Sequence, residues 1–199
     1  MAKKDKLSLE NLLDFVRFTH LFQKIARVVL VNGEERFEND AEHSYQLTLV
    51  AWYLLEYNKL NLEVNKVILL ALTHDLVEAY AGDTYIYAKA EILARKKERE
   101  EEAIKLLREN FPEFSSLHDL IYEYEKRETS ESKFVYALDK LLPVLNIYLD
   151  NGRTWQKERI TLEQLLANKT AKVSLSPEIV PYYEELVSLL KRGKGLFSV

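Results

Sequence analysis

The sequence predicts an all-α fold, built as a single-domain bundle of about six to nine helices. Only five glycines and four prolines occur in 199 residues, so the chain holds few residues that interrupt helices. Apolar residues also recur over long stretches at the three- and four-residue spacing that places them on one helix face. No segment has a convincing strand pattern, and a chain of this length can bury one sizeable core.

The first predicted helical region begins after Ser8, a suitable N-cap, and ends at Asn32-Gly33, which leaves room for two helices. Within it the apolar residues Leu9, Leu12, Leu13 and Val16 recur at helical spacing. Asp40 can cap the next helix, because a short acidic side chain there can accept hydrogen bonds from the first free backbone N–H groups. The inward face of this second helix consists of His43, Leu47, Val50 and Leu54.

A third helix is expected from about Val64 to Tyr80, with Gly82 ending it. This segment is apolar nearly all round, which predicts that it is the central, buried helix. Five further helices follow it, and the first of them has a dense polar face that is typical of a solvated surface. They span residues 89–110, 114–125, 130–150, 155–169 and 177–192, the last with Ser176 as N-cap and Pro177 at its first position.

The composition excludes several classes of function. A net charge of −4 with both signs interspersed gives no basic stripe, so polymeric nucleic acid is not the expected partner. No apolar run approaches the roughly 18 residues of a membrane span, and the N-terminus lacks the apolar core of a signal peptide, so the expected location is cytoplasmic. Because the chain has no cysteine, only His, Asp and Glu remain as strong metal ligands.

Acidic and imidazole side chains stand where the helical pattern predicts burial. On the third helix, His74 and Glu78 are four residues apart, and Asp75 and Glu78 are three apart, so they project from one surface. His43 lies on the core face of the second helix. Asp139 lies on the apolar face of the helix at 130–150, where an unpaired carboxylate would be expensive. Two imidazoles and two carboxylates on one ion predict a divalent metal with room for water.

A second His-Asp pair occurs at His118-Asp119, beside two serines and without a glutamate three residues later. This pair is interpreted as a surface or helix-start feature rather than a ligand pair. His20 has no acidic companion at ligand spacing, so a structural role is expected for it. A lone His-Asp dipeptide therefore carries little information, and the prediction depends on the wider pattern.

That wider pattern, His43, then His74-Asp75, then Asp139, resembles the signature of HD-domain metal-dependent phosphohydrolases. Three stretches are similar to segments of the 5'-deoxynucleotidase (YfbR/HDDC-type) branch: RFENDAEHSYQ from Arg36, THDLVEAYAGDT from Thr73 and ESKFVYALDKL from Glu131. The resemblance covers roughly residues 10–150. It implies one HD-type helical domain over residues 1–199, in which C-terminal helices at 155–192 pack on the core that bears the motifs.

The resemblance also implies an activity: hydrolysis of deoxynucleoside 5'-monophosphates to deoxynucleoside and phosphate, by a homodimer that uses a divalent ion (Co, Mn, Zn, Ni, Mg or Fe). Glu78 and Asp83 match the two further acids of this branch, placed near the attacking water, the substrate or a second cation. For the substrate phosphate, Arg27 and Arg36 are rival candidates. The metal ligands carried over by position are His43, His74, Asp75 and Asp139.

Two other functions stay open on the sequence. One keeps the metal and changes the substrate to a nucleoside di- or triphosphate or a cyclic nucleotide. The motif neighbourhoods offer few cations for extra phosphates, which disfavours a triphosphate; these cations are Arg27, Arg36, Lys133 and Lys140. The other is a non-catalytic helical regulatory protein, which is disfavoured because every acid and imidazole of the pattern is present.

Overall fold

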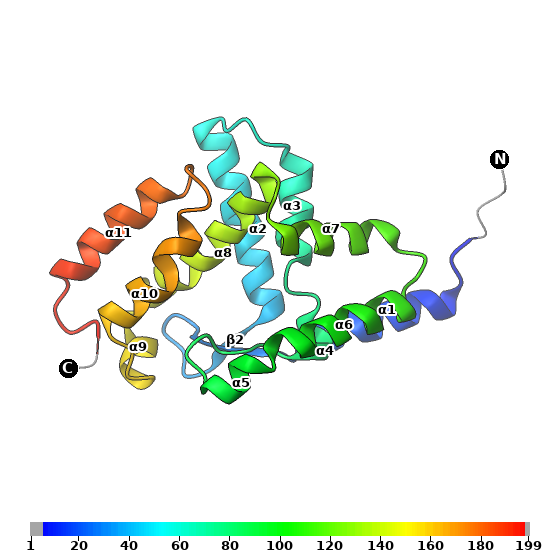
Figure 1. Ribbon diagram of the computed structural model, residues 1–199, viewed down its shortest axis with the longest axis horizontal. Coiled ribbons are helices and arrows are strands. Elements are labelled where there is room, and N and C mark those ends of the chain that lie inside the picture. Colours follow the sequence, from blue (N-terminus) through cyan, green and yellow to red (C-terminus); the bar gives the residue numbers. More distant parts are fainter. Residues whose placement is uncertain (1–5, 198–199) are drawn as a thin grey trace.

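The computed structural model describes residues 6–197 and is largely helical (Figure 1). Its elements are α1 (Leu9–Phe22), β1 (Ala26–Leu30), β2 (Phe37–Asn39), α2 (Asp40–Asn58), α3 (Val64–Thr73), α4 (Glu78–Ala81), α5 (Ala90–Ala94), α6 (Lys96–Asn110), α7 (Ser115–Lys126), α8 (Ser130–Leu149), α9 (Arg153–Lys157), α10 (Leu162–Val173) and α11 (Val180–Arg192). Within the described part, eight helices have ten or more residues, which confirms the predicted class and helix number. None of the helices in residues 6–197 combines the length and apolar character needed to cross a bilayer.

One β-hairpin contradicts the prediction that the chain has no strand. Strands β1 and β2 pair antiparallel, with Ala26 opposite Asn39 and Leu30 opposite Phe37. Asn32-Gly33 lies in the connecting loop, where Gly33 has a φ of 75°. An Asn-Gly pair between short apolar runs is a hairpin signal, so the pair turns the chain between strands instead of ending a helix. The Leu30 N–H donates to Thr154 Oγ1 at 3.0 Å, which ties the hairpin to α9.

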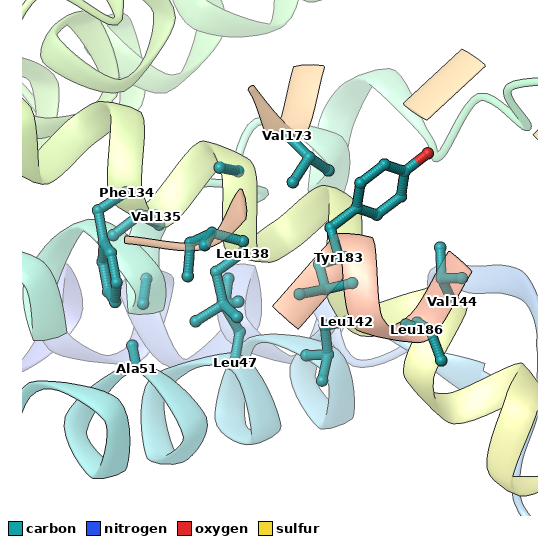
Figure 2. Close-up of a cluster of buried hydrophobic side chains, with 14 of the residues drawn as sticks. Leu47, Ala51, Phe134, Val135, Leu138, Leu142, Val144, Val173, Tyr183 and Leu186 are labelled. Atoms are coloured by element: carbon teal, nitrogen blue, oxygen red, sulfur yellow. The ribbon is translucent and has the colours of Figure 1, made fainter. Parts of the chain in front are cut away.

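The main core surrounds α8, against which α2, α3, α10 and α11 pack. Figure 2 shows side chains of α8, including Phe134, Leu138 and Leu142, facing Leu47 and Ala51 of α2. The central helix is therefore α8 and not the predicted helix at 64–80. Leu69 and Leu72 of α3 are exposed, because the described helices that pack on α3, namely α2, α7 and α8, leave this side of it uncovered.

The predicted helix from Val64 to Tyr80 is broken. Helix α3 ends at Thr73, residues 74–77 form turns, and α4 begins at Glu78. In this break the backbone N–H of Glu78 donates to the carbonyl of Asp75 at 2.8 Å, a tighter pattern than that of an α-helix. Gly82, with a φ of 74°, then ends α4 as expected.

A second, smaller core joins α1 to α4, α6 and α7, which gather on one side of the molecule (Figure 1). Ser8 caps α1 as predicted by accepting a hydrogen bond from the Asn11 N–H at 3.1 Å. On α1, Phe18 and Phe22 are buried, whereas the four apolar residues that recur at helical spacing nearer its N-terminus are exposed. These four are Leu9, Leu12, Leu13 and Val16. Periodicity identifies an apolar face but not which end of it is covered.

Several predicted boundaries shift by a few residues. The N-cap of α2 is Asn39, which forms a reciprocal capping box with Glu42, so Asp40 is the first helical residue and its carboxylate is free for other contacts. The expected helix at 155–169 is two helices, since α9 ends at Lys157 and Thr161 caps α10. The last helix starts at Val180, with Pro181 rather than Pro177 in its first turn. The predicted helix at 89–110 is interrupted at Arg95.

We expect Leu47→Ala to destabilise the fold by about 2–5 kcal/mol, because Leu47 is 0% exposed between α2 and α8 and truncation leaves a cavity. Leu69→Ala, on α3 at 47% exposure and outside this core, is the matched control and should change stability by less than about 0.5 kcal/mol. Urea unfolding at a fixed metal concentration measures both. Equal losses would show that this face of α2 is not the core.

Candidate metal centre

Three elements bring four predicted side chains together. His43 extends from the first turn of α2, and Asp139 comes from the middle of α8. His74 and Asp75 lie in the turn that follows α3. One donor atom from each of the four lies within 4.8 Å of the other three.

The donor atoms face one another. His43 Nε2 lies 3.1 Å from Asp139 Oδ1 and 4.0 Å from Asp75 Oδ2. His74 Nε2 lies 2.9 Å from Asp75 Oδ2 and 3.7 Å from Asp139 Oδ1. Metal–nitrogen and metal–oxygen bonds of about 2.0–2.2 Å place two ligands of one ion up to about 4.4 Å apart, so a small contraction of this group suits one divalent ion.

His74 is oriented for coordination. Its Nδ1 donates to the carbonyl of Ala71 at 2.9 Å, which leaves the lone pair on Nε2. That Nε2 is buried and, within residues 6–197, makes no hydrogen bond of good geometry, although Asp75 Oδ2 is close to it. A buried nitrogen aimed at two carboxylates without a hydrogen bond is the arrangement expected when a cation completes the group.

The two carboxylate oxygens of Asp139 have different partners. Oδ1 faces the histidines, whereas Oδ2 accepts a hydrogen bond from the Tyr124 hydroxyl at 2.9 Å and another from the Lys140 ammonium. Burial and the Asp139 carboxylate both raise the pKa of Tyr124, so its hydroxyl stays protonated and donates. Tyr124 and Lys140 thus fix the carboxylate plane with Oδ1 toward the metal position.

A second acidic group adjoins the first and shares Asp75. Donor oxygens of Asp40, Asp75 and Glu78 also lie within 4.8 Å of one another. Arg27 neutralises part of this charge, because its Nη1 donates to Asp75 Oδ2 at 2.7 Å and to Asp40 Oδ1 at 3.1 Å. Asp40 is fully buried, and sequence reasoning assigned it only a capping role. The helix-capping pattern conceals it, since a cap and a buried acid have the same local sequence.

Burial and mutual repulsion change the protonation of these acids. Burial, and then the Asp75 carboxylate, raise the pKa of Glu78 well above its ordinary value. Burial and Asp75 also raise the pKa of Asp40 to about 6, against the opposing effect of Arg27. Burial raises the pKa of Asp83 as well. Groups of this kind can take up and release protons near neutral pH.

Arg27, which contacts Asp75, also lines a cavity together with Asp83. Its other walls are mostly apolar and include Tyr85, Tyr87 and Trp155. The cavity thus has charged groups as well as aromatic walls, which suits a ligand with an anionic end and a ring system.

Three other sequence candidates lie elsewhere in the described chain. Arg36 is half exposed near the hairpin and pairs with Glu34 and Glu42, away from the cavity lining. His118 donates from Nε2 to the carbonyl of Phe111 at 2.8 Å and is not part of either acidic group. His20 is exposed and is likewise not part of either acidic group in the described chain.

The HD domain family model matches residues 22–180. The chain belongs to the HD domain family. Among its relatives, a 5'-deoxynucleotidase HDDC2 from Bos taurus is 33% identical over 181 residues, which are 88% of this chain and 84% of the relative. The enzyme of the same name from Mus musculus is 32% identical over 191 residues, covering 94% and 92% of the two chains.

The fold of this chain is also similar to that of solved structures. A predicted metal-dependent phosphohydrolase from Magnetospirillum magnetotacticum superposes with a TM-score of 0.82 and 31% identity, over 96% of both chains. The family match thus extends beyond the three short motifs to the C-terminal helices up to residue 180. The cluster of two histidines and two aspartates in this HD domain is compatible with a divalent metal.

We expect Tyr124→Phe to weaken metal binding by about 10–100-fold, because Asp139 loses a hydrogen bond that fixes its orientation. The control is Tyr122→Phe, which removes an exposed hydroxyl from the same helix and should leave affinity unchanged. Titration of metal-stripped protein with Mn²⁺ by calorimetry measures both. Unchanged affinity in Tyr124→Phe would show that Lys140 alone orients the carboxylate.

Proposed function

We propose that this HD-domain protein is a metal-dependent phosphomonoesterase that hydrolyses deoxynucleoside 5'-monophosphates to deoxynucleoside and phosphate. The observation that carries the proposal is the buried cluster of His43, His74, Asp75 and Asp139 beside a cavity with charged and aromatic walls. The names of the relatives, 5'-deoxynucleotidases at about one-third identity over most of both chains, support the substrate class.

His43, His74, Asp75 and Asp139 would hold the ion, and this donor set suits Mn, Fe, Co, Ni, Zn or Mg. When bound, a divalent ion lowers the pKa of water and neutralises charge on the phosphate, the two needs of phosphate ester hydrolysis. Side chains of the protein would carry out the proton transfers and orient the substrate.

Glu78 is proposed as the group that takes a proton from the attacking water. It begins α4, three residues after Asp75, and its Oε2 is buried without a hydrogen-bond partner in the described chain. An oxygen in that state is free to accept a proton. Asp83 follows Gly82 at the cavity wall, where it can protonate the leaving 5'-oxygen or bind the sugar.

Arg27 is preferred over Arg36 as the group that orients the substrate phosphate. Arg27 lies in the cavity wall and is held in place by Asp40 and Asp75. Arg36 is already paired with two glutamates at the surface. A fixed guanidinium offers oriented donors to phosphate without losing conformational freedom on binding.

We also propose that the protein acts as a homodimer. The support is a set of large apolar side chains that α2 leaves exposed, since contiguous exposed apolar surface marks interaction sites. These side chains are Leu49, Trp52, Tyr53 and Tyr57.

With deoxynucleoside 5'-monophosphates, the metal-loaded protein should release phosphate at least about tenfold faster than with the 3' isomers. The reason is geometric, because the phosphate must reach the metal position while the sugar reaches Asp83. A colorimetric assay of inorganic phosphate, run over a panel of nucleoside mono-, di- and triphosphates, measures the rate of phosphate release from each. Faster turnover of triphosphates, with pyrophosphate or triphosphate as product, would instead favour the alternative substrate class.

Two single substitutions separate metal binding from catalysis. Asp75→Ala should lose both metal and activity, whereas Glu78→Ala should keep its metal and lose at least about a hundredfold in turnover. Asp119→Ala is the matched control, because it alters the exposed acid of the second His-Asp pair and should keep both. Elemental analysis and steady-state rates measure the two properties. Loss of stoichiometric metal from Glu78→Ala would make Glu78 a ligand and refute its assignment as the base.

A further inference from the structure

Lys169 is a buried cation outside the three motifs. It lies on α10 between Leu165 and Val173, four residues from each, and both of these are buried against the main core. The position is therefore a core position of an amphipathic helix, where an apolar residue is expected. The side chain of Lys169 does not reach solvent in the usual way of surface lysines, since the residue is only 6% exposed.

The ammonium of Lys169 has no protein anion beside it. Within residues 6–197 no hydrogen bond or ion pair involves this group, and burial lowers its pKa to about 7. The two other cations near the metal centre are paired, Arg27 with Asp75 and Lys140 with Asp139. Burying an amine without a partner is costly, so a lysine kept at such a position indicates a partner that arrives from elsewhere.

The cavity offers a route for that partner. Lys169 lines the same cavity as Arg27 and Asp83. Lys169 lies on the side of the metal centre, because α10 packs on α8, the helix that carries Asp139. The charges of Lys140, Asp139, Lys172 and Arg27 act on its ammonium. The aromatic walls, Tyr85, Tyr87 and Trp155, offer surface for a nucleoside base. An anion close to the metal centre is therefore the ligand that suits Lys169.

We propose that Lys169 binds the phosphate group of the substrate, together with Arg27, and so contributes a phosphate-binding residue from the C-terminal helices. This inference rests on the proposed phosphatase function for the identity of the substrate. Binding of a phosphate anion by Lys169 is a separate property that can be measured without turnover.

The test uses full-length protein loaded with Mn²⁺ and compares Lys169→Met with the wild type. Inorganic phosphate should raise the thermal midpoint of the wild type, and the phosphate concentration needed for half of that shift should rise at least about tenfold in Lys169→Met. Deoxyadenosine, which lacks the phosphate, should stabilise both proteins equally. Lys172→Met is the control, because Lys172 lies on the same helix, bonds Asn168 and is absent from the cavity wall. It should respond to phosphate as the wild type does.

Kinetics separate this inference from the proposed function. For a deoxynucleoside 5'-monophosphate, Lys169→Met should have a kcat/KM at least about tenfold below that of the wild type, with metal content unchanged. A wild type that hydrolyses the monophosphate while Lys169→Met keeps both its phosphate response and its kcat/KM would overturn the role of Lys169 alone. A wild type with no hydrolysis but a phosphate response that depends on Lys169 would overturn the proposed function and leave the anion site standing.

A measurement on the wild type covers the case in which Lys169→Met does not fold. Acylation by an amine-reactive reagent, followed by peptide mass spectrometry, gives the modification rate of each lysine. Inorganic phosphate should slow modification of Lys169 at least about fivefold, since a bound anion holds the amine protonated and covers it, and should leave Lys172 unchanged. Equal rates at Lys169 with and without phosphate would contradict the proposal.

Discussion

The structure depends on how a concentration of buried negative charge is balanced. Five carboxylates meet between α2, α8 and the turn after α3: Glu38, Asp40, Asp75, Glu78 and Asp139. The described cations in direct contact with them are Arg27 and Lys140. Carboxylates this close repel one another strongly in a medium of low dielectric constant. A divalent cation among the histidines and aspartates would remove much of that repulsion. Without a cation, burial and then repulsion by Asp75 raise the pKa values of Glu78 and Asp40.

The interruption between α3 and α4 sets the relative positions of His74 and Asp75. On a continuous helix His74 and Asp75 would point about 100° apart. The turn at 74–77 instead brings His74 Nε2 to 2.9 Å from Asp75 Oδ2, while α8 supplies Asp139 from the centre of the core. Rigid packing of α8 against α2 then sets the 3.1 Å separation of His43 and Asp139. The same contacts that stabilise the fold therefore position the donors.

The cavity beside the metal centre joins Asp83 of the second motif to parts of the chain that the motifs do not cover. Arg27 comes from the hairpin, Asp83 from the loop after α4, and Trp155 and Lys169 from the C-terminal helices. Packing of α10 on α8 carries Lys169 toward the metal centre. This division suits the proposed function, because the proposed chemistry needs a fixed donor set whereas recognition of a nucleoside would need a wall of suitable shape.

The sequence by itself determined the helical class, the donor set that is compatible with a metal, and the exclusion of His118 from that donor set. Each of these follows from residue types and from spacings along one helix, which are local properties. The HD domain match and the convergence of His43, His74, Asp75 and Asp139 agree with that reading.

Only the tertiary structure decided the rest. The hairpin at 26–39, the break at 74–77, the exposed half of α1 and the contacts of Asp40, Tyr124 and Lys169 were not predicted. Several of these features depend on contacts between different elements, as when Tyr124 of α7 orients Asp139 of α8. Local spacing gives the direction of a side chain relative to its own helix, but burial and partners depend on which other elements pack there.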